Sequence, residues 1–207
     1  MERLSSIYAA AKIFTRAAAT EAAAVEWLGR TRVAHFAVHG VADTERPHAS
    51  ALLLADSALL HAYEVQRLDL GGLELAVLSA CETGVGRGVP GEGVQALTYS
   101  FLLAGASSVT GSLWRVPDTS TSTLMTRFHA GLQRGARPSQ ALLQAQSTLL
   151  QNPSLAHPYF WAAFQILGAD EPLWLAEPAM ALATVGAVAA RLRSTPRAMP
   201  ALRVQPR

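Results

Sequence analysis

Short, nearly continuous apolar runs alternate along this chain of 207 residues with longer segments of helix-forming composition. The apolar runs have the length of buried strands and are bounded by glycine, proline or polar residues. The longer segments begin at candidate capping residues or at proline, as helices do. This alternation predicts an α/β fold with a mostly parallel sheet and helices on both faces. The predicted strands are residues 32–38, 73–79, 107–113 and 159–167, and the main predicted helices are 94–104, 120–133 and 139–150.

Smaller elements complete the pattern. Residues 5–29 are rich in alanine and contain no proline, which favours helix, with Thr20 as the N-cap of the last part. Residues 51–54 and 58–61 are apolar and flank a polar turn, which indicates a hairpin. A short helix is predicted at 64–68.

The composition fits one domain followed by a tail. Half of the residues are hydrophobic, which is enough to bury a sizeable core. We predict one domain over residues 1–170 and a flexible tail, rich in Ala, Pro and Arg, over residues 171–207. Residues 178–207 contain five arginines and no acid, so the remaining residues carry a formal charge of −3 although the whole chain carries +2. A body without excess positive charge does not favour a nucleic-acid partner.

Three further features bear on the cellular setting. A single cysteine excludes an internal disulfide framework. Residues 1–30 lack the basic and apolar regions of a signal peptide. The longest mostly apolar stretch, residues 178–190, is shorter than the roughly 18 residues that suggest a membrane-spanning helix. We therefore expect a cytoplasmic protein without a membrane span.

A thiol and an imidazole lie where two predicted strands end. His39 follows the run at 32–38, and Cys81 follows the run at 73–79. Because functional groups gather at the carboxyl ends of parallel strands, we expect the two side chains to lie together. An imidazole promotes ionisation of a neighbouring thiol and can later protonate a leaving amine. The pattern indicates the Cys-His dyad of a cysteine protease.

Loops are expected directly after both strands, and they suggest an oxyanion hole. Attack by a thiolate on a carbonyl creates an oxyanion that backbone N–H groups must stabilise. If the chain turns tightly after each strand, the amides of Gly40 and Cys81 are the candidate donors. Gly40 also lacks a Cβ that would hold the substrate away from the backbone.

Other chemistries fit the sequence less well. His35 and His39 are four residues apart, but their segment is predicted as a strand, and a zinc site needs three or four ligands. An acyl transferase usually places its nucleophile in a strand-to-helix elbow, whereas about ten residues separate Cys81 from the next predicted helix. No metal or cofactor is predicted. The tryptophans at 114, 161 and 174 are expected in the core.

Several segments resemble the CHAT domains, caspase-like modules related to caspases, separases and clostripain. The most specific are residues 35–40, His-Phe-Ala-Val-His-Gly, and residues 77–84, Val-Leu-Ser-Ala-Cys-Glu-Thr-Gly. The resemblance implies a three-layer caspase-haemoglobinase fold. It also implies peptide hydrolysis through a thioester acyl-enzyme, with His39 as general acid/base and Cys81 as nucleophile. Similar segments continue at 93–105, 112–118, 124–128, 141–146 and 157–164.

The same resemblance suggests a substrate preference. In separases, an acid in a Leu-Trp-x-x-x-Asp segment helps to form the pocket for a basic P1 side chain. Residues 113–118 look like this segment, which makes Asp118 the candidate P1-binding residue. An aspartate just before a helical stretch is also a preferred N-cap. The resemblance thus implies a bacterial-type endopeptidase that cleaves a protein substrate after Arg or Lys.

CHAT domains usually begin further upstream, often behind tetratricopeptide repeats. Residues 1–30 show neither that upstream material nor a repeat. We therefore expect the N-terminal part of the usual domain to be missing and one sheet edge to be exposed. A regulatory or tetratricopeptide-repeat protein is a possible partner. A catalytically inactive CHAT-fold module that binds proteins remains the alternative to a protease.

Overall fold

The computed structural model describes residues 7–8, 11–43, 45–79, 81–85, 92–173 and 182–186, with the backbone alone at 81–85, 92–94 and 182–186. The strands are β1 (Lys12–Thr15), β2 (Val33–Ala37), β3 (His39–Asp43), β4 (Ala51–Leu53), β5 (Leu59–His61), β6 (Leu75–Leu78), β7 (Cys81–Val85), β8 (Ser108–Ser112), β9 (Phe164–Gly168) and β10 (Leu182–Gly186). The helices are α2 (Glu21–Leu28), α3 (Ala62–Val65), α4 (Glu92–Leu103), α5 (Asp118–Gln133) and α6 (Pro138–Leu150), with short 3₁₀ helices η1 (Arg16–Ala18), η2 (Pro47–Ala49), η3 (Ala55–Ser57) and η4 (Pro158–Phe160).

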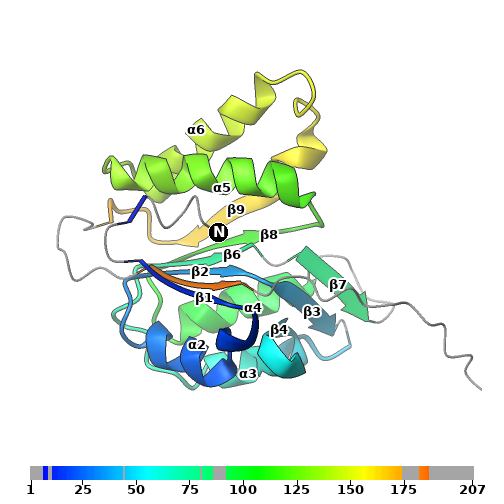
Figure 1. Cartoon of the computed structure of the whole chain (residues 1–207), viewed down its shortest axis with the longest axis vertical. Coiled ribbons are helices and arrows are strands. Elements are labelled where there is room, and N and C mark those ends of the chain that lie inside the picture. Colours follow the sequence, from blue (N-terminus) through cyan, green and yellow to red (C-terminus); the bar gives the residue numbers. More distant parts are fainter. Residues whose placement is uncertain are drawn as a thin grey trace, which may run out of the picture.

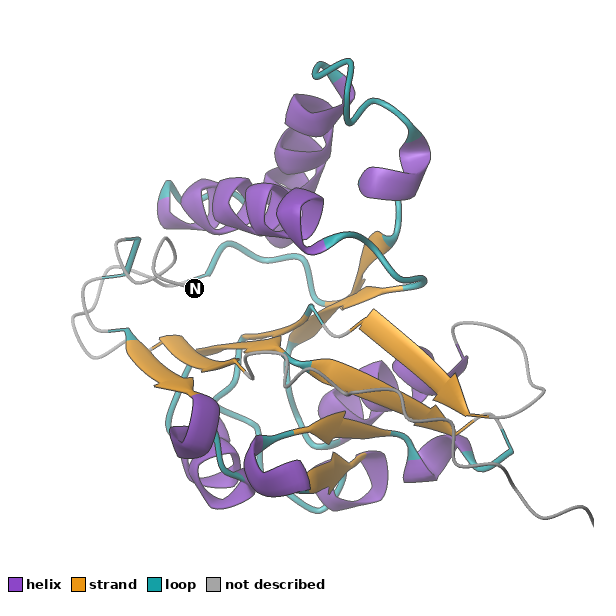
Figure 2. Cartoon of the chain, turned by 45° about the vertical axis from the view of Figure 1, so that its right-hand side comes forward, coloured by secondary structure: helices purple, strands orange, loops and turns teal. Residues whose placement is uncertain are grey.

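A six-stranded sheet in the order β1-β10-β2-β6-β8-β9 forms the middle layer of the molecule. Its strands are parallel except for β9, which pairs antiparallel with β8. Helices α5 and α6 cover one face, and α2, α3 and α4 lie on the other (Figures 1 and 2). The predicted α/β architecture with a mostly parallel sheet and helices on both faces is confirmed.

Two cores follow from the alternation of side chains along the central strands. Ala34 and Phe36 of β2 belong to the core shared with α2, α3 and α4. Val33 of β2, together with Leu75 and Val77 of β6, belongs to the core shared with α5 and α6. These strands are buried on both faces, which explains their nearly continuous apolar sequence.

A second, four-stranded sheet in the order β5-β4-β3-β7 extends from the end of the first. The β4–β5 pair is the predicted hairpin, and β3 joins it antiparallel to β4. Strand β7 pairs parallel with β3. In Figure 1, β3 and β7 lie beyond the ends of β2 and β6.

The N-terminal region differs from the prediction. Residues 12–15, expected within a helix, form β1, which pairs parallel with β10. Their sequence, Lys-Ile-Phe-Thr, contains β-branched and aromatic residues that favour a strand once a partner strand is present. Helix α2 does begin after Thr20, whose Oγ1 accepts a hydrogen bond of 3.2 Å from the Ala23 N–H.

Strand β10 lies within the segment expected to be a flexible tail. Its five residues insert between β1 and β2, so the outer strands of the sheet are β1 and β9. The remaining residues of the tail after Leu173 lie outside the described part of the chain, and the boundary predicted at residue 170 stays a prediction. Within the described residues, no helix is both long enough and apolar enough to cross a membrane.

Candidate functional site

His39 and Cys81 lie at the two joints where the chain passes from one sheet into the other. Only Val38 separates β2 from β3, and residues 79 and 80 separate β6 from β7. His39 is the first residue of β3, Cys81 is the first residue of β7, and the two are register partners in these parallel strands. Neighbouring strands are about 4.8 Å apart, and directly paired positions share one face of a sheet. The fold therefore brings these two positions together.

The pairing is continuous across both sheets. Partner residues are 42 positions apart in β2–β6, as in Val33 with Leu75, and also in β3–β7, as in His39 with Cys81. The two strand pairs thus form one parallel ribbon that is interrupted at the joints. Because His39 and Cys81 lie in paired strands and not in loops, the strand register fixes their relative positions.

The expected tight turns after His39 and Cys81 are absent from the described residues, because the chain continues as strand at both places. Gly40 lies inside β3, where it is the register partner of Leu52 in β4 and Glu82 in β7. Along β3, burial alternates, with Gly40 and Ala42 buried and their neighbours half-buried. This alternation over five residues is typical of a strand, and sequence reasoning, which expected a loop here, missed it.

Asp118 is exposed and is the first residue of α5. Pro117 occupies the N-cap position, so the interpretation of Asp118 as the N-cap is wrong by one residue. A carboxylate in the first helical turn still interacts favourably with the helix dipole. Strand β8 ends at Ser112, one residue after Gly111, and Gly111 is the register partner of Leu78, the last residue of β6. Because β6 and β8 are parallel, the loop that leads to Asp118 leaves the sheet at the same edge as the β6–β7 joint.

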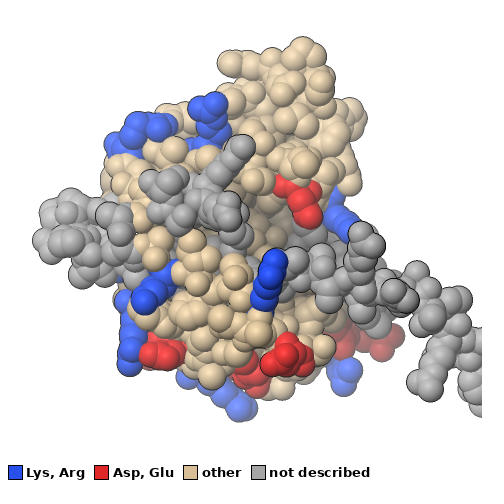
Figure 3. Space-filling view, viewed as in Figure 1, with Lys and Arg blue, Asp and Glu red and all other residues tan. Residues whose placement is uncertain are grey.

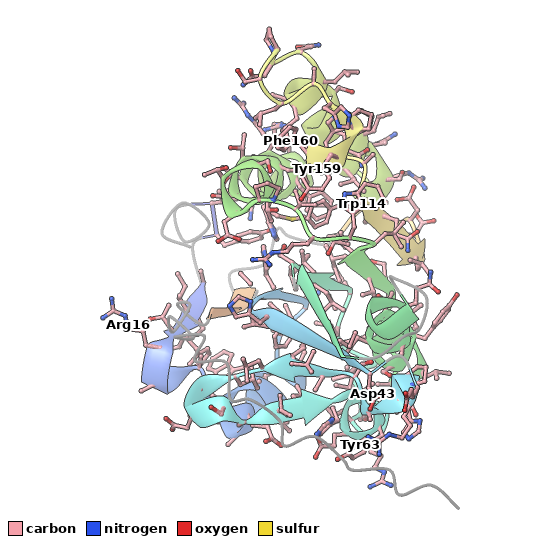
Figure 4. All side chains as sticks on the ribbon, turned by 90° about the vertical axis from the view of Figure 1, so that its right-hand side faces the viewer. Arg16, Asp43, Tyr63, Trp114, Tyr159 and Phe160 are labelled. Atoms are coloured by element: carbon pink, nitrogen blue, oxygen red, sulfur yellow. The ribbon has the colours of Figure 1, made fainter. Side chains whose placement is uncertain are left out.

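Aromatic contacts anchor the loop between β8 and α5. The Trp114 Nε1–H donates to the Tyr159 carbonyl oxygen at 3.0 Å. The rings of Tyr159 and Phe160 meet edge to face, with centroids 5.4 Å apart (Figure 4). Trp114 and Trp161 are partly buried against the core beneath α5 and α6, which supports their predicted core role, whereas Trp174 lies outside the described residues.

Beneath the joints, four polar side chains form what we call the histidine network: Tyr8, His129, His35 and Ser79. The Tyr8 hydroxyl lies 2.8 Å from His129 Nδ1. His129 Nε2 lies 2.9 Å from His35 Nδ1, and His35 Nε2 lies 3.0 Å from Ser79 Oγ. The network connects the N-terminal segment, α5 and β2 with the joint two residues before Cys81.

Burial makes the histidine network electrically neutral. It lowers the pKa of His129 to about 3 and lowers the pKa of His35 well below its ordinary value, with the neighbouring His129 as a lesser cause. Burial also raises the pKa of Tyr8. At neutral pH both imidazoles are uncharged and the phenol keeps its proton. Sequence reasoning considered His35 only as a zinc ligand and missed Tyr8 and His129.

Three further observations on the described residues concern metal binding, surface depressions and charge. They contain no group of three or more His, Cys, Asp or Glu side chains that would hold a metal ion. A shallow depression of about 720 Å³, lined by residues that include Glu21, Val25 and Asp56, lies between α2 and the β4–β5 turn rather than at the joints. Figure 3 shows basic and acidic side chains interspersed on one face of the molecule.

Comparison with known proteins gives a family match over most of the chain. The family model described as the CHAT domain matches residues 1–169. Two curated relatives are similar over about half of the chain. Tetratricopeptide repeat protein 28 of Mus musculus is 35% identical over 101 residues, which are 49% of this chain and 4% of that protein. Tetratricopeptide repeat protein 28 of Homo sapiens is 36% identical over 115 residues, 56% of this chain and 5% of that protein.

Proposed function

Because the chain belongs to the CHAT domain family, we propose that it is a caspase-like cysteine endopeptidase with a caspase-haemoglobinase-like fold. Cys81 is the nucleophile and His39 is the general acid/base. The observation that carries this proposal is the register of the β3–β7 pair, in which the only cysteine of the chain is the direct partner of His39.

The proposed reaction has two stages. In the first, His39 accepts the thiol proton, the Cys81 sulfur bonds to the substrate carbonyl carbon, and the tetrahedral intermediate collapses to a thioester as His39 protonates the leaving amine. In the second, His39 accepts a proton from water and the resulting hydroxide adds to the thioester carbonyl carbon. The carbon–sulfur bond then breaks, the Cys81 thiolate takes back the proton from His39, and the carboxylic acid product leaves and ionises in solution. The amides of Gly40 and Cys81 are the proposed oxyanion donors, because both residues lie within one residue of the joints at which His39 and the nucleophile are placed.

Asp118 is the proposed recognition group for a basic P1 side chain. Its carboxylate is exposed, and it begins α5 beyond the sheet edge where β6 ends. The preceding loop is anchored through Trp114, which limits the range of positions the carboxylate can take. A guanidinium or ammonium group would form a charge-assisted hydrogen bond with it. The proposal therefore specifies Arg or Lys at P1 of a protein substrate.

A second candidate function is a catalytically inactive CHAT module that binds a protein partner. The sizes of the relatives favour it, since this chain spans only 4–5% of the tetratricopeptide repeat proteins that it matches. Tetratricopeptide-repeat proteins are accordingly the proposed class of regulatory partner.

A peptide-cleavage assay separates the two functions. We expect the full chain to cleave peptides with Arg or Lys at P1, and Cys81→Ala and His39→Ala to abolish cleavage. His48→Ala is the matched control, because His48 is an exposed histidine in η2 away from the joints. Full activity of the Cys81→Ala variant would refute the protease proposal. No cleavage of a P1 peptide library by the wild-type protein would favour the binding module.

A further inference from the structure

The histidine network ends at the joint that leads to the proposed nucleophile. Ser79 is held there by two hydrogen bonds, both from β2. Its N–H donates to the Phe36 carbonyl oxygen at 2.9 Å, and its Oγ is 3.0 Å from His35 Nε2. Cys81 follows two residues later in the chain, so Ser79 is held close to the proposed nucleophile in sequence.

The burial of Tyr8 determines the direction of the hydrogen bonds in the network. Its hydroxyl keeps its proton, and within the described part of the chain His129 Nδ1 is the acceptor in reach. A neutral imidazole that accepts at Nδ1 carries its proton on Nε2. His129 therefore donates from Nε2 to His35 Nδ1, and His35 donates from Nε2 to Ser79 Oγ.

This direction has a consequence for Ser79. Its oxygen is engaged as an acceptor by His35, so its own hydroxyl hydrogen is directed away from the imidazole. Ser79 is half-buried, whereas His35 and His129 are buried. The network thus orients a hydroxyl donor, and the backbone that carries it, at the boundary between the core and the proposed site.

A purely structural role would not require these residues. Four polar groups in an apolar core are stabilising only when every partner is present, and apolar side chains of the same volume would fill the space without that condition. The polar groups instead determine orientation, because the proton position on each side chain sets which atom of the next side chain donates and which accepts. Val77, Leu124 and Phe128 belong to the apolar core around them, and the Phe128 ring meets the His129 ring edge to face, with centroids 5.5 Å apart.

We propose that His35, held by His129 and Tyr8, is a positioning residue that acts through Ser79 to fix the joint presenting Cys81 for attack. This inference rests on the proposed role of Cys81 as nucleophile. It assigns no proton transfer to the network, whose members remain neutral throughout. Through the network, the geometry of the joint also depends on Tyr8, which lies in the segment before β1.

Alkylation by iodoacetamide tests the inference without knowledge of the substrate, because the chain contains one cysteine. We expect Ser79→Ala to lower the second-order rate constant roughly tenfold, as for the loss of one hydrogen bond, and Ser79→Thr to restore it. His35→Asn places its amide near the position of Nδ1 and loses the bond to Ser79. His35→Gln places its amide near Nε2 and keeps that bond. The Asn variant is therefore expected to react about tenfold more slowly than the Gln variant.

The outcomes distinguish this inference from the proposed function. Each rate is measured at a temperature at which circular dichroism shows the variant folded, and His39→Ala is included in the series. If His39→Ala is slow but Ser79→Ala reacts like wild type, the inference is refuted and the dyad stands. Equal rates for His35→Asn and His35→Gln would also refute it, since a structural role alone predicts that result. If His39→Ala reacts like wild type, the proposed function fails.

Discussion

Acidification from pH 7.5 to pH 5.0 is expected to destabilise this protein through His35 and His129. In the folded protein, burial lowers the pKa of His129 to about 3 and that of His35 well below 6.5. In the unfolded chain both imidazoles regain a pKa of about 6.5. Below that pH the unfolded state binds up to two more protons than the folded state. The free energy of unfolding therefore falls as the pH falls.

The magnitude follows from the linkage relation. Well below pH 6.5, each neutral buried histidine costs about 1.4 kcal/mol per pH unit. At pH 5.0 this amounts to about 2 kcal/mol for each residue and about 4 kcal/mol for the pair. A domain with a total stability of about 5–15 kcal/mol would lose much of it. Asp43 and Asp170 do not contribute in this window, because hydrogen bonds lower their pKa values and stability from them is lost only at lower pH.

Urea unfolding followed by circular dichroism at several pH values between 7.5 and 5.0 measures this loss. His129→Gln removes one of the two titrating groups and is expected to reduce the slope between pH 6.0 and 5.0 by about half, even though it also lowers stability at pH 7.5. The exposed His48→Ala variant is the control and should keep the wild-type slope. A free energy of unfolding that does not change between pH 6.5 and 5.0 would show that the two buried histidines are not held neutral.

Three further predictions concern specificity, sheet closure and backbone conformation. Asp118→Asn is expected to lower kcat/KM for a peptide with Arg at P1 by roughly tenfold or more, with cleavage after an uncharged P1 residue as the reference; equal losses for both peptides would contradict a role in P1 binding. A chain ending at Leu173 lacks β10 and should unfold at a lower temperature and scatter more light than a chain ending at Gly186, and identical melting curves would contradict this. Gly168→Ala should cost at least about 2 kcal/mol more than Gly135→Ala in urea unfolding, because both glycines have positive φ but only at Gly168 would a Cβ collide with a neighbouring backbone carbonyl; similar losses would contradict it.

The central architecture could be predicted because its signals are local. The strands β2 and β6 are buried on both faces and are largely apolar runs. Strand β8, Ser-Val-Thr-Gly-Ser, is also fully buried, although Val109 is its only large apolar residue. Helices α5 and α6 begin within two residues of the positions expected from the sequence. The meeting of His39 and Cys81 followed from a rule of parallel sheets, in which strands end at a common edge.

The missed strands depend on partners that are remote in sequence. In β1, Lys12 pairs with Ala183 of β10. Strand β1 has only four residues, and β10 lies in an alanine-rich apolar stretch whose composition does not distinguish a strand from a helix. Strands β3 and β7 mix glycine and polar residues, and they become strands because β2 and β6 deliver them side by side in register. Such pairing is a property of the assembled sheet.

The histidine network escaped prediction for a different reason. Nothing in the sequence indicates that His35, in a strand, and His129, in a helix, are hydrogen-bonded to each other. Tyr8 is likewise 121 positions away from its partner His129. One hint was available. His129 shares the buried face of its helix with Leu124, Met125 and Leu132, and a polar residue on an apolar face requires a partner in the core.

The position of β10 between β1 and β2 bears on how the chain reaches its final form during synthesis. Strands β2, β6 and β8 can pair as soon as they leave the ribosome, but β1 has to wait for a strand that is made some 170 residues later. Until then β2 is an open edge capable of pairing with another chain. The last of the described strands therefore completes the sheet from within, and the exposure of the β2 edge ends only once this segment has been synthesised.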